Sequence, residues 1–269
     1  QIIKQFNPDI AIGTGGYASG PLLFAASRKG IPSLIQEQNS YPGITTRTLS
    51  KFADKICIGY NDSKKYFNNN TIFSGNPIRN DFIKTDKNKA KEKIKINKDR
   101  FTIFICGGSQ GSKPINEHII NNINYYNNLD ATIIWQCGMN HYNTISSLNL
   151  NTNIKLFDFI DHMDQMYSAS DLIISRAGAL TLSEINFFGK ASILIPFPFS
   201  AGNHQYKNAL FSQNANASII VTQNELNNGK LEKTINDLIN SPNKLTNMEV
   251  AAKSISTSNA MDIIIKEIQ

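Results

Sequence analysis

Three glycine-rich turns each follow a short apolar run and precede a helix-like segment. They span Gly13 to Pro21 (GTGGYASGP), Gly107 to Ser112 (GGSQGS) and Ser175 to Glu184 (SRAGALTLSE). Glycine lets backbone amides approach a phosphate closely, and a helix N-terminus adds partial positive charge. One such turn is weak evidence, because tight strand-to-helix turns also use glycine for steric reasons. Three of them in one α/β chain predict a nucleotide site between two domains.

Glu184, at the end of the third turn, has two interpretations. Residues Thr181 to Glu184 (TLSE) fit the S/T-x-x-E capping box, and the pattern by itself favours this role. In the alternative, the Glu184 carboxylate accepts hydrogen bonds from a ribose diol while the preceding backbone amides face a diphosphate.

Three further polar features are suggestive. Arg79, in GNPIR, could pair with a phosphate or sugar across a cleft, although an isolated arginine is more often solvated. Asn39 follows a buried strand at the end where α/β proteins bind ligands, but a polar strand end is also typical of a plain loop. Arg47, Lys51 and Lys55 recur every four residues, so a helix from about residue 44 would display them on one face, either solvated or attracted to an acidic membrane.

The elements that must position these residues alternate between short apolar runs and longer amphipathic segments. This rhythm predicts βα units and a parallel sheet. Ile-rich runs without polar alternation are typical of strands buried on both faces. We expect strands at Asp9 to Gly13, Ser33 to Gln36, Lys55 to Gly59, Phe101 to Cys106, Ala131 to Gln136, Ile154 to Phe157, Leu172 to Ser175, Ser192 to Ile195 and Ser218 to Val221.

The expected strands fall into two groups. Three precede and six follow a polar stretch whose middle reads KTDKNKAKEK. We therefore expect an N-terminal domain over residues 1–80, a linker over 81–100 and a C-terminal domain over 101–269. Apolar residues at helical spacing from Asn243 onward predict one or two closing helices.

Composition limits the class of protein. The 269 residues are 41% hydrophobic and 18% charged, which is typical of a soluble globular protein. The net charge of +6 favours an anionic partner, but the basic residues are dispersed and no aromatic-interleaved basic motif predicts nucleic-acid binding. No apolar run approaches the roughly 20 residues that span a bilayer. The three widely spaced cysteines are expected to be reduced core thiols, and no His/Cys spacing predicts a metal site.

Seven sequence blocks together resemble a known family. In order, GTGGYASGP, QEQNSYPG, SGNPIR, GGSQGS, DFIDHM, SRAGALTLSE and GNHQYKNA resemble the signature blocks of the MurG family of N-acetylglucosaminyltransferases, in glycosyltransferase family 28. The resemblance implies a GT-B fold, in which two Rossmann-like domains with parallel sheets face each other across a cleft. Family members begin with another glycine loop, GGTGGH, which nothing before Asp9 matches. We therefore expect an incomplete, N-terminally truncated acceptor and membrane-side domain.

The resemblance also implies a donor site in the C-terminal domain. Ile160 would present its backbone to the uracil, Glu184 would hold the ribose, and Gln205 would reach the sugar hydroxyls. Ser109 and the amides of the third turn would face the diphosphate. Gly15, Gly16 and Tyr17 would help to hold the acceptor's diphosphate. The full donor set is Asn39, Arg79, Ser109, Ile160, Ala179, Leu180, Thr181, Leu182, Ser183, Glu184 and Gln205.

The implied reaction is hexosyl transfer with inversion. N-acetylglucosamine passes from UDP-N-acetylglucosamine to the C4 hydroxyl of the muramyl sugar of undecaprenyl-linked lipid I, giving lipid II. No cofactor is implied, and the residues do not identify a catalytic base. The implied location is the cytoplasmic face of the inner membrane, as a peripheral protein of peptidoglycan synthesis, cell-wall biogenesis, cell shape and cell division.

Two alternatives remain open from the sequence. The chain could bind a UDP-sugar without turnover, because the donor-side motifs are intact and the acceptor side is not. It could also be a UDP-N-acetylglucosamine 2-epimerase of the same fold, although the GTGGYASGP block argues against this.

Overall fold

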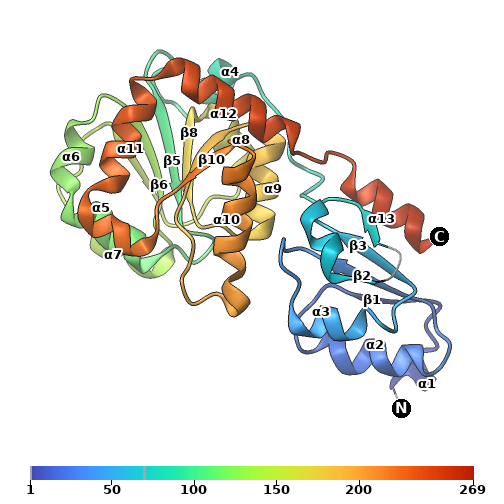
Figure 1. Cartoon of the computed structure of the whole chain (residues 1–269). Coiled ribbons are helices and arrows are strands. Elements are labelled where there is room, and N and C mark those ends of the chain that lie inside the picture. Colours follow the sequence, from blue (N-terminus) through green and yellow to red (C-terminus); the bar gives the residue numbers. More distant parts are fainter. Residues whose placement is uncertain (1, 69–70) are drawn as a thin grey trace.

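A computed structural model describes residues 2–68 and 71–269, which form two parallel-sheet α/β units (Figure 1). The first unit holds a four-stranded sheet in the order β1-β2-β3-β4, and the second a six-stranded sheet in the order β10-β9-β8-β5-β6-β7. Every described strand pair is parallel. The strands are β1 (Ala11–Gly13), β2 (Ser33–Glu37), β3 (Lys55–Ile58), β4 (Thr71–Phe73), β5 (Thr102–Cys106), β6 (Thr132–Gln136), β7 (Ile154–Phe157), β8 (Leu172–Ser175), β9 (Ala191–Leu194) and β10 (Ser218–Ile220).

Helices connect the strands and cover both faces of each sheet, as parallel pairing requires. The α-helices are α1 (Ile2–Phe6), α2 (Ser19–Ser27), α3 (Ile44–Leu49), α4 (Lys87–Lys93), α5 (Lys113–Asn121), α6 (Ile123–Asn128), α7 (Met139–Ser146), α8 (Met163–Ala169), α9 (Ala179–Phe188), α10 (His204–Asn214), α11 (Lys230–Ile239), α12 (Pro242–Ser254) and α13 (Ala260–Ile268). Short 3-10 helices lie at Asn61–Tyr66, Ala201–Asn203 and Gln223–Asn228.

All nine strands expected from the apolar runs are present, with ends displaced by at most two residues. The sequence prediction missed β4. This strand has only three residues, none of them fully buried. A run that short lacks the length by which an apolar strand is recognised in a sequence.

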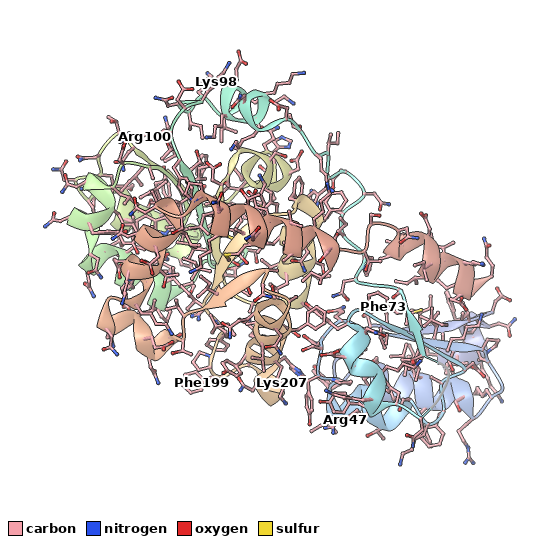
Figure 2. All side chains as sticks on the ribbon, turned by 45° about the horizontal axis from the view of Figure 1, so that its top comes forward. Arg47, Phe73, Lys98, Arg100, Phe199 and Lys207 are labelled. Carbon is pink, nitrogen blue, oxygen red and sulfur yellow. The ribbon has the colours of Figure 1, made fainter. Side chains whose placement is uncertain are left out.

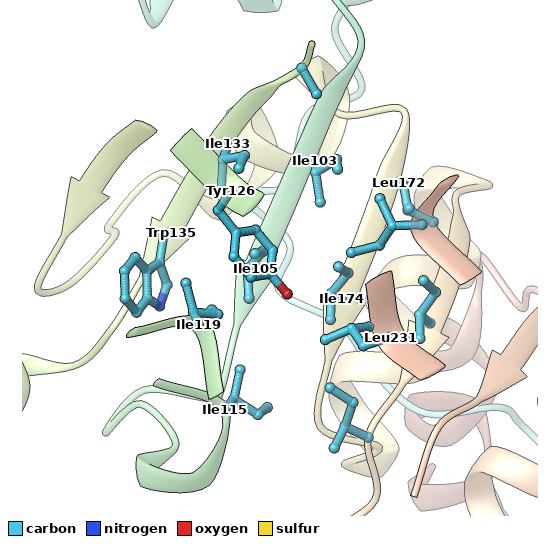
Figure 3. Close-up of a cluster of buried hydrophobic side chains, with 14 of the residues drawn as sticks. Ile103, Ile105, Ile115, Ile119, Tyr126, Ile133, Trp135, Leu172, Ile174 and Leu231 are labelled. Carbon is cyan, nitrogen blue, oxygen red and sulfur yellow. The ribbon is translucent and has the colours of Figure 1, made fainter. Parts of the chain in front are cut away.

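The core of the second unit has two layers, one on each face of its sheet. Side chains alternate along β5, so Ile103 and Ile105 pack toward α5, α6 and α11, while Phe104 and Cys106 pack toward α8 and α9. Figure 3 shows the first layer, in which Tyr126 lies over Ile105 between the strands and the helices. The strands that carry the second and third glycine turns are therefore packed on both faces.

The first unit is completed by the end of the chain. Its sheet buries Ile35, Ile56 and Ile58 against α2 and α3 on one face. On the opposite face, Leu34 and Cys57 pack against Ile264 of α13. Figure 1 shows α12 running across the second unit toward the first, and α13 lying on the first sheet. The closing helices are therefore present, and the last one belongs spatially to the first unit.

The polar stretch 81–100 is anchored to the second unit. Its helix α4 packs on α8. Lys91, only 2% exposed, donates to the backbone carbonyls of Lys98 and Arg100 and lies 3.5 Å from Asp171. The boundaries at residues 80 and 100 stay a prediction.

The expected row of three cations on one helix is wrong. Helix α3 ends at Leu49, so Lys51 lies beyond it and Lys55 begins β3. Lys55 pairs instead with Glu267 of α13, at 3.1 Å. The short strand-helix-strand connection leaves no room for the longer helix that the four-residue spacing suggested.

Candidate functional site

The second glycine turn, Gly107 to Ser112, lies at the carboxyl end of β5 and needs its glycines. Gly108 and Gly111 have φ of +97° and +73°, which L side chains rarely adopt. A Cβ on Gly111 would also collide with the carbonyl oxygen of Cys137. Ser109, at the tip of the turn, is exposed. The turn is thus an open backbone loop beside the helix α5.

The third turn leads into α9, and the capping-box interpretation of Glu184 is wrong. Helix α9 begins at Ala179 with Gly178 as its N-cap, which places Glu184 in the second turn of the helix. The first hydrogen bond that closes the helix runs from the Leu182 amide to the Gly178 carbonyl. The amides of residues 179–181 are therefore the unpaired donors of a helix N-terminus, which favours an anion.

A pocket opens between these two turns and the segment that follows β4. Five of the predicted donor residues line it, and they come from four separate segments of the chain: Arg79, Ser109, Ile160, Thr181 and Glu184. The other lining residues are Cys106, Gly108, Gln136, Phe159, Met163, Tyr167 and Arg176.

The Glu184 carboxyl is positioned by a hydrogen bond from a buried tyrosine. The Tyr167 hydroxyl donates to Glu184 Oε2 at 2.9 Å. Burial raises the pKa of Glu184 above its ordinary value, against the lowering effect of the Tyr167 hydrogen bond and of the Arg79 charge. The second carboxylate oxygen has no hydrogen bond within residues 2–68 and 71–269. It is therefore free to accept from a ligand hydroxyl.

Arg79 stands at the mouth of the pocket. Its guanidinium forms a bidentate salt bridge with Asp81, in which Nε donates to Oδ1 at 3.1 Å and Nη2 to Oδ2 at 2.9 Å. It also lies 5.3 Å from the centre of the Phe82 ring. The Asp81 hydrogen bond raises the pKa of Arg79. Arg79 is thus both solvent-exposed and pocket-lining, so the two sequence interpretations are compatible.

Ile160 and Gln205 also have the free groups that their predicted roles need. The Ile160 side chain is buried, while its backbone amide and carbonyl make no hydrogen bond to the rest of the described chain. Gln205 Oε1 accepts from the amides of Phe197 and Ala177, at 2.9 and 3.2 Å. Its Nε2 group makes no hydrogen bond to the described residues.

Six predicted donor residues do not line the pocket: Asn39, Ala179, Leu180, Leu182, Ser183 and Gln205. Leu182 is fully buried in the core, so only its backbone faces the turn. Asn39 donates to Glu37 Oε1 through its amide and Nδ2, at 2.9 and 3.2 Å, and Ser183 accepts from Asn76. Asn39 also accepts from Asn208 of the second unit at 3.2 Å, so Asn39 and Ser183 both sit at the junction of the two units.

The first glycine turn is open and strongly exposed. Gly15 and Gly16 have φ of +92° and +75°, and Tyr17 is 90% exposed. The turn is joined to the next strand end by a 3.5 Å hydrogen bond from Gln38 Nε2 to the Thr14 carbonyl. It belongs to the first unit and does not line the pocket.

Arg176 and Gln136 were missed as pocket residues by the sequence prediction. The Arg176 guanidinium, only 8% exposed, donates to Ser112 Oγ, the carbonyls of Ile195 and Pro196, and Gln223 Oε1. All these partners are neutral, and burial lowers the pKa of Arg176 to about 10. Gln136 ends β6 and donates to the carbonyls of residues 109 and 158. A polar residue at a strand end was the available signal.

The described residues contain no group of three or more His, Cys, Asp or Glu side chains arranged to hold a metal ion.

Family profiles match both units. The profile described as Glycosyltransferase family 28 C-terminal domain matches residues 102–265. The profile described as Glycosyltransferase family 28 N-terminal domain matches residues 1–58.

Curated relatives from several bacteria carry the name UDP-N-acetylglucosamine–N-acetylmuramyl-(pentapeptide) pyrophosphoryl-undecaprenol N-acetylglucosamine transferase. The protein of that name from Desulforamulus reducens is 38% identical, over 98% of this chain and 74% of its own length. The one from Flavobacterium psychrophilum is 39% identical, over 99% of this chain and 73% of its own length.

Solved structures agree. The crystal structure of Acinetobacter baumannii MurG matches with a TM-score of 0.83 and 30% identity, covering 100% of this chain and 75% of that one. A UDP-GlcNAc 2-epimerase from Neisseria meningitidis, bound to UDP-GlcNAc, matches with a TM-score of 0.68 at 17% identity, covering 99% of this chain and 77% of that one. The second likeness shows a shared fold alone.

Proposed function

The chain belongs to glycosyltransferase family 28 and has the GT-B fold, and from this premise we infer that it is a hexosyltransferase that moves N-acetylglucosamine from UDP-N-acetylglucosamine to lipid I, giving lipid II. The observation that carries the inference is the pocket between the two glycine turns of the second unit, closed on its outer side by Arg79. It gathers a helix N-terminus, a free carboxylate oxygen and a cation.

The donor has a natural orientation in this pocket. The free backbone groups of Ile160 hydrogen-bond to the uracil edge, and the free Glu184 oxygen accepts from the ribose diol. The diphosphate lies at the unpaired amides of residues 179–181 and at Ser109, with Arg79 at the mouth. Gln205 Nε2 remains available for a sugar hydroxyl.

The reaction follows from this orientation. The C4 hydroxyl oxygen of the muramyl sugar forms a bond to C1 of the donor sugar as the bond from C1 to the UDP oxygen breaks, which inverts C1. The hydroxyl releases its proton, so the products are lipid II, UDP and one proton. Negative charge develops on the departing UDP. The fixed backbone amides and the dipole of α9 stabilise that charge without reorganising, which is the largest kind of contribution in most enzymes.

The acceptor binds from the side of the first unit. The open amides of Gly15 and Gly16, with Tyr17 beside them, suit the diphosphate of the lipid-linked acceptor. The three residues follow β1 at its carboxyl end. In the second unit, Ala177 just after β8 is joined to Ser40 of the first unit through Asn208.

Peripheral association with the cytoplasmic face of the inner membrane is part of the proposal. No described helix combines the length and apolar character needed to cross a bilayer. Large apolar side chains are nevertheless exposed on α1, where Ile2 is 77% and Phe6 79% exposed, and on α2, where Leu22 and Phe24 are 46% and 45% exposed. Exposed apolar side chains next to lysine and arginine suit a membrane surface. Peptidoglycan synthesis places the protein in cell-wall biogenesis, and with it in cell shape and division.

Radiolabelled sugar transfer to a soluble lipid I analogue, beside calorimetric UDP binding, tests the proposal. We expect transfer that depends on the acceptor, and UDP binding with 1:1 stoichiometry. UDP binding without transfer would instead support a UDP-sugar-binding protein without turnover. The 2-epimerase alternative is not favoured, because the curated relatives named above are transferases; release of N-acetylmannosamine would be its signature.

A further inference from the structure

Two buried asparagines, Asn76 and Asn208, lie where the two units meet. Asn76 follows β4 of the first unit and is 2% exposed. Asn208 lies on α10 of the second unit and is fully buried. Neither belongs to the pocket. Buried carboxamides are retained only where their hydrogen-bonding groups are satisfied, so the partners of these two residues are informative.

Asn208 joins the first unit to the third glycine turn. Its Oδ1 accepts from the Ser40 amide at 2.9 Å and from Ser40 Oγ at 3.0 Å. Its Nδ2 donates to Asn39 Oδ1 at 3.2 Å and to the Ala177 carbonyl at 3.4 Å. Both partners of Oδ1 are donors and both partners of Nδ2 are acceptors. This pattern fixes the orientation of the Asn208 carboxamide.

Asn76, in the first unit, makes a second link, which reaches α9 of the second unit. Its Oδ1 accepts from Gln36 Nε2 at 3.0 Å. Its Nδ2 donates to the Gln38 carbonyl at 2.9 Å and to Ser183 Oγ, on α9, at 3.1 Å. A Cβ on Gly59 would collide with Asn76 Oδ1, so the glycine makes room for the carboxamide.

The hydrogen bonds of Asn76 and Asn208 connect the same two segments of the chain. On the first unit they meet the strand-end loop of residues 38–40. On the second unit they reach Ala177 and Ser183, which flank the helix N-terminus whose amides are assigned to the donor diphosphate. A change in the shape of this segment therefore changes hydrogen bonds to the first unit, and the reverse holds equally.

We propose that Asn76 and Asn208 are positioning residues that couple the shape of the donor-binding segment 177–184 to the approach of the first unit. The proposal rests on the proposed function for the identity of that segment. A donor nucleotide that orders the segment then favours the arrangement in which the acceptor side is brought up to it. The two residues touch neither substrate, so their effect is on how the bound substrates are aligned.

Asn76→Asp and Asn208→Asp test this with little change of shape. Each retains an oxygen that accepts the hydrogen bonds at Oδ1, and each loses the Nδ2 donor that reaches the donor segment. Gly59→Ala is an independent route, because it displaces the Asn76 carboxamide without altering its chemistry. Asn214→Asp is the matched control, because Asn214 is an exposed asparagine on the same helix as Asn208. Thermal melting identifies variants that fold.

For the folded test variants we expect kcat for transfer to fall about tenfold, the effect of losing one or two hydrogen bonds. The dissociation constant for UDP should change less than threefold. In small-angle X-ray scattering, UDP should narrow the distribution of interatomic distances for the wild-type chain and for Asn214→Asp, and should leave it unchanged for the test variants.

Unchanged kcat and an unchanged UDP response in folded Asn208→Asp and Asn76→Asp chains would overturn the coupling. So would a loss of UDP affinity as large as the loss of kcat, because that would make the residues part of the donor site itself. If the wild-type chain transfers no sugar, the proposed function fails, but the scattering comparison with UDP still decides the coupling.

Discussion

At the scale of single residues, the site partly buries a polar group that is also available to bind a ligand. Glu184 is partly buried with a raised pKa, and one of its carboxylate oxygens has no hydrogen-bond partner among the described residues, so it is available to a ligand. Such an arrangement favours ligand binding at the expense of stability, because a charged carboxylate is less well solvated there than in water.

Glu184→Gln should weaken UDP binding roughly tenfold, because a neutral amide oxygen is a poorer acceptor for the ribose diol. Calorimetry with UDP measures the loss. Glu117→Gln, an exposed acid on α5, is the control and should bind like the wild-type chain. Equal UDP affinity in both variants would remove Glu184 from the donor site.

The same variant has a pH-dependent effect on stability. Because burial raises the pKa of Glu184 in the folded chain, the charged carboxylate destabilises the folded state. The penalty is absent below the unfolded pKa of about 4.3, grows as pH rises above it, and is complete above the folded pKa. Glu184→Gln should therefore melt higher than the wild type at pH 7 and equally at pH 4. Higher melting of the wild type at pH 7 would contradict this sign.

At the scale of elements, buried polar groups decide which helices stay together. Glu232 of α11 accepts from the Tyr126 hydroxyl of α6 at 3.0 Å and pairs with His118 Nε2 of α5 at 2.7 Å. Burial alone would raise the pKa of Glu232, but hydrogen bonds from His118, from its own backbone amide and from Tyr126, together with attraction to His118, outweigh burial and lower the pKa. One carboxylate thus ties three helices together.

Glu232→Gln should lower the free energy of unfolding by about 1–3 kcal/mol at pH 7, because a buried charge-assisted bond is lost. A lowered pKa means that the stabilisation exists above the unfolded pKa of about 4.3 and disappears as pH falls through the folded pKa. Urea unfolding at pH 7 and at acid pH measures both. An equal difference at the two pH values would exclude the ionised carboxylate as the cause.

Helix α13 protects a thiol in the first unit. Burial raises the pKa of Cys57 to about 11, and Ile264 of α13 packs on it. Ile264→Ala should cost about 2–5 kcal/mol of local stability and speed the reaction of Cys57 with a disulfide reagent. Peptide mass spectrometry measures the modification rate of Cys57 against those of Cys106 and Cys137, which are also buried and lie in the second unit. Equal acceleration at all three would indicate global unfolding instead.

At the scale of the whole molecule, the junction of the two units has an aromatic contact beside the asparagine links. The Tyr41 ring lies 3.1 Å from Lys207 Nζ of α10 and 5.1 Å from the Arg47 guanidinium of α3. Figure 2 shows Arg47 and Lys207 on the two sides of this junction. A cation of the second unit thus rests on a ring of the first.

Tyr41→Leu and Lys207→Met should each lower the melting temperature slightly, and their effects should be non-additive, with a coupling of about 0.5–2 kcal/mol. A double-mutant cycle in thermal unfolding measures it. Tyr17→Leu paired with Lys207→Met serves as the control cycle, because Tyr17 is 90% exposed in the first unit. Additive effects in both cycles would mean that the contact between Lys207 and the Tyr41 ring does not contribute to stability.

Much of the fold and part of the site follow from the sequence, because they depend on local residue types. Buried parallel strands need consecutive apolar residues, so the runs at residues 101–106 and 172–175 predict β5 and β8. Tight turns need glycine where φ is positive, so Gly108 and Gly111 predict the second turn. Since such strands all end at the same edge, the meeting of Ser109 with Glu184 is also predictable.

Only the tertiary structure decided which distant polar groups satisfy one another. Tyr167 under Glu184, Asn76 on Ser183 and Asn208 on Ser40 join residues 17, 107 and 168 positions apart. The return of α13 to the first sheet is equally long-range. A buried hydrogen bond depends on where two groups lie when water is excluded, and no local pattern of residue types specifies that position.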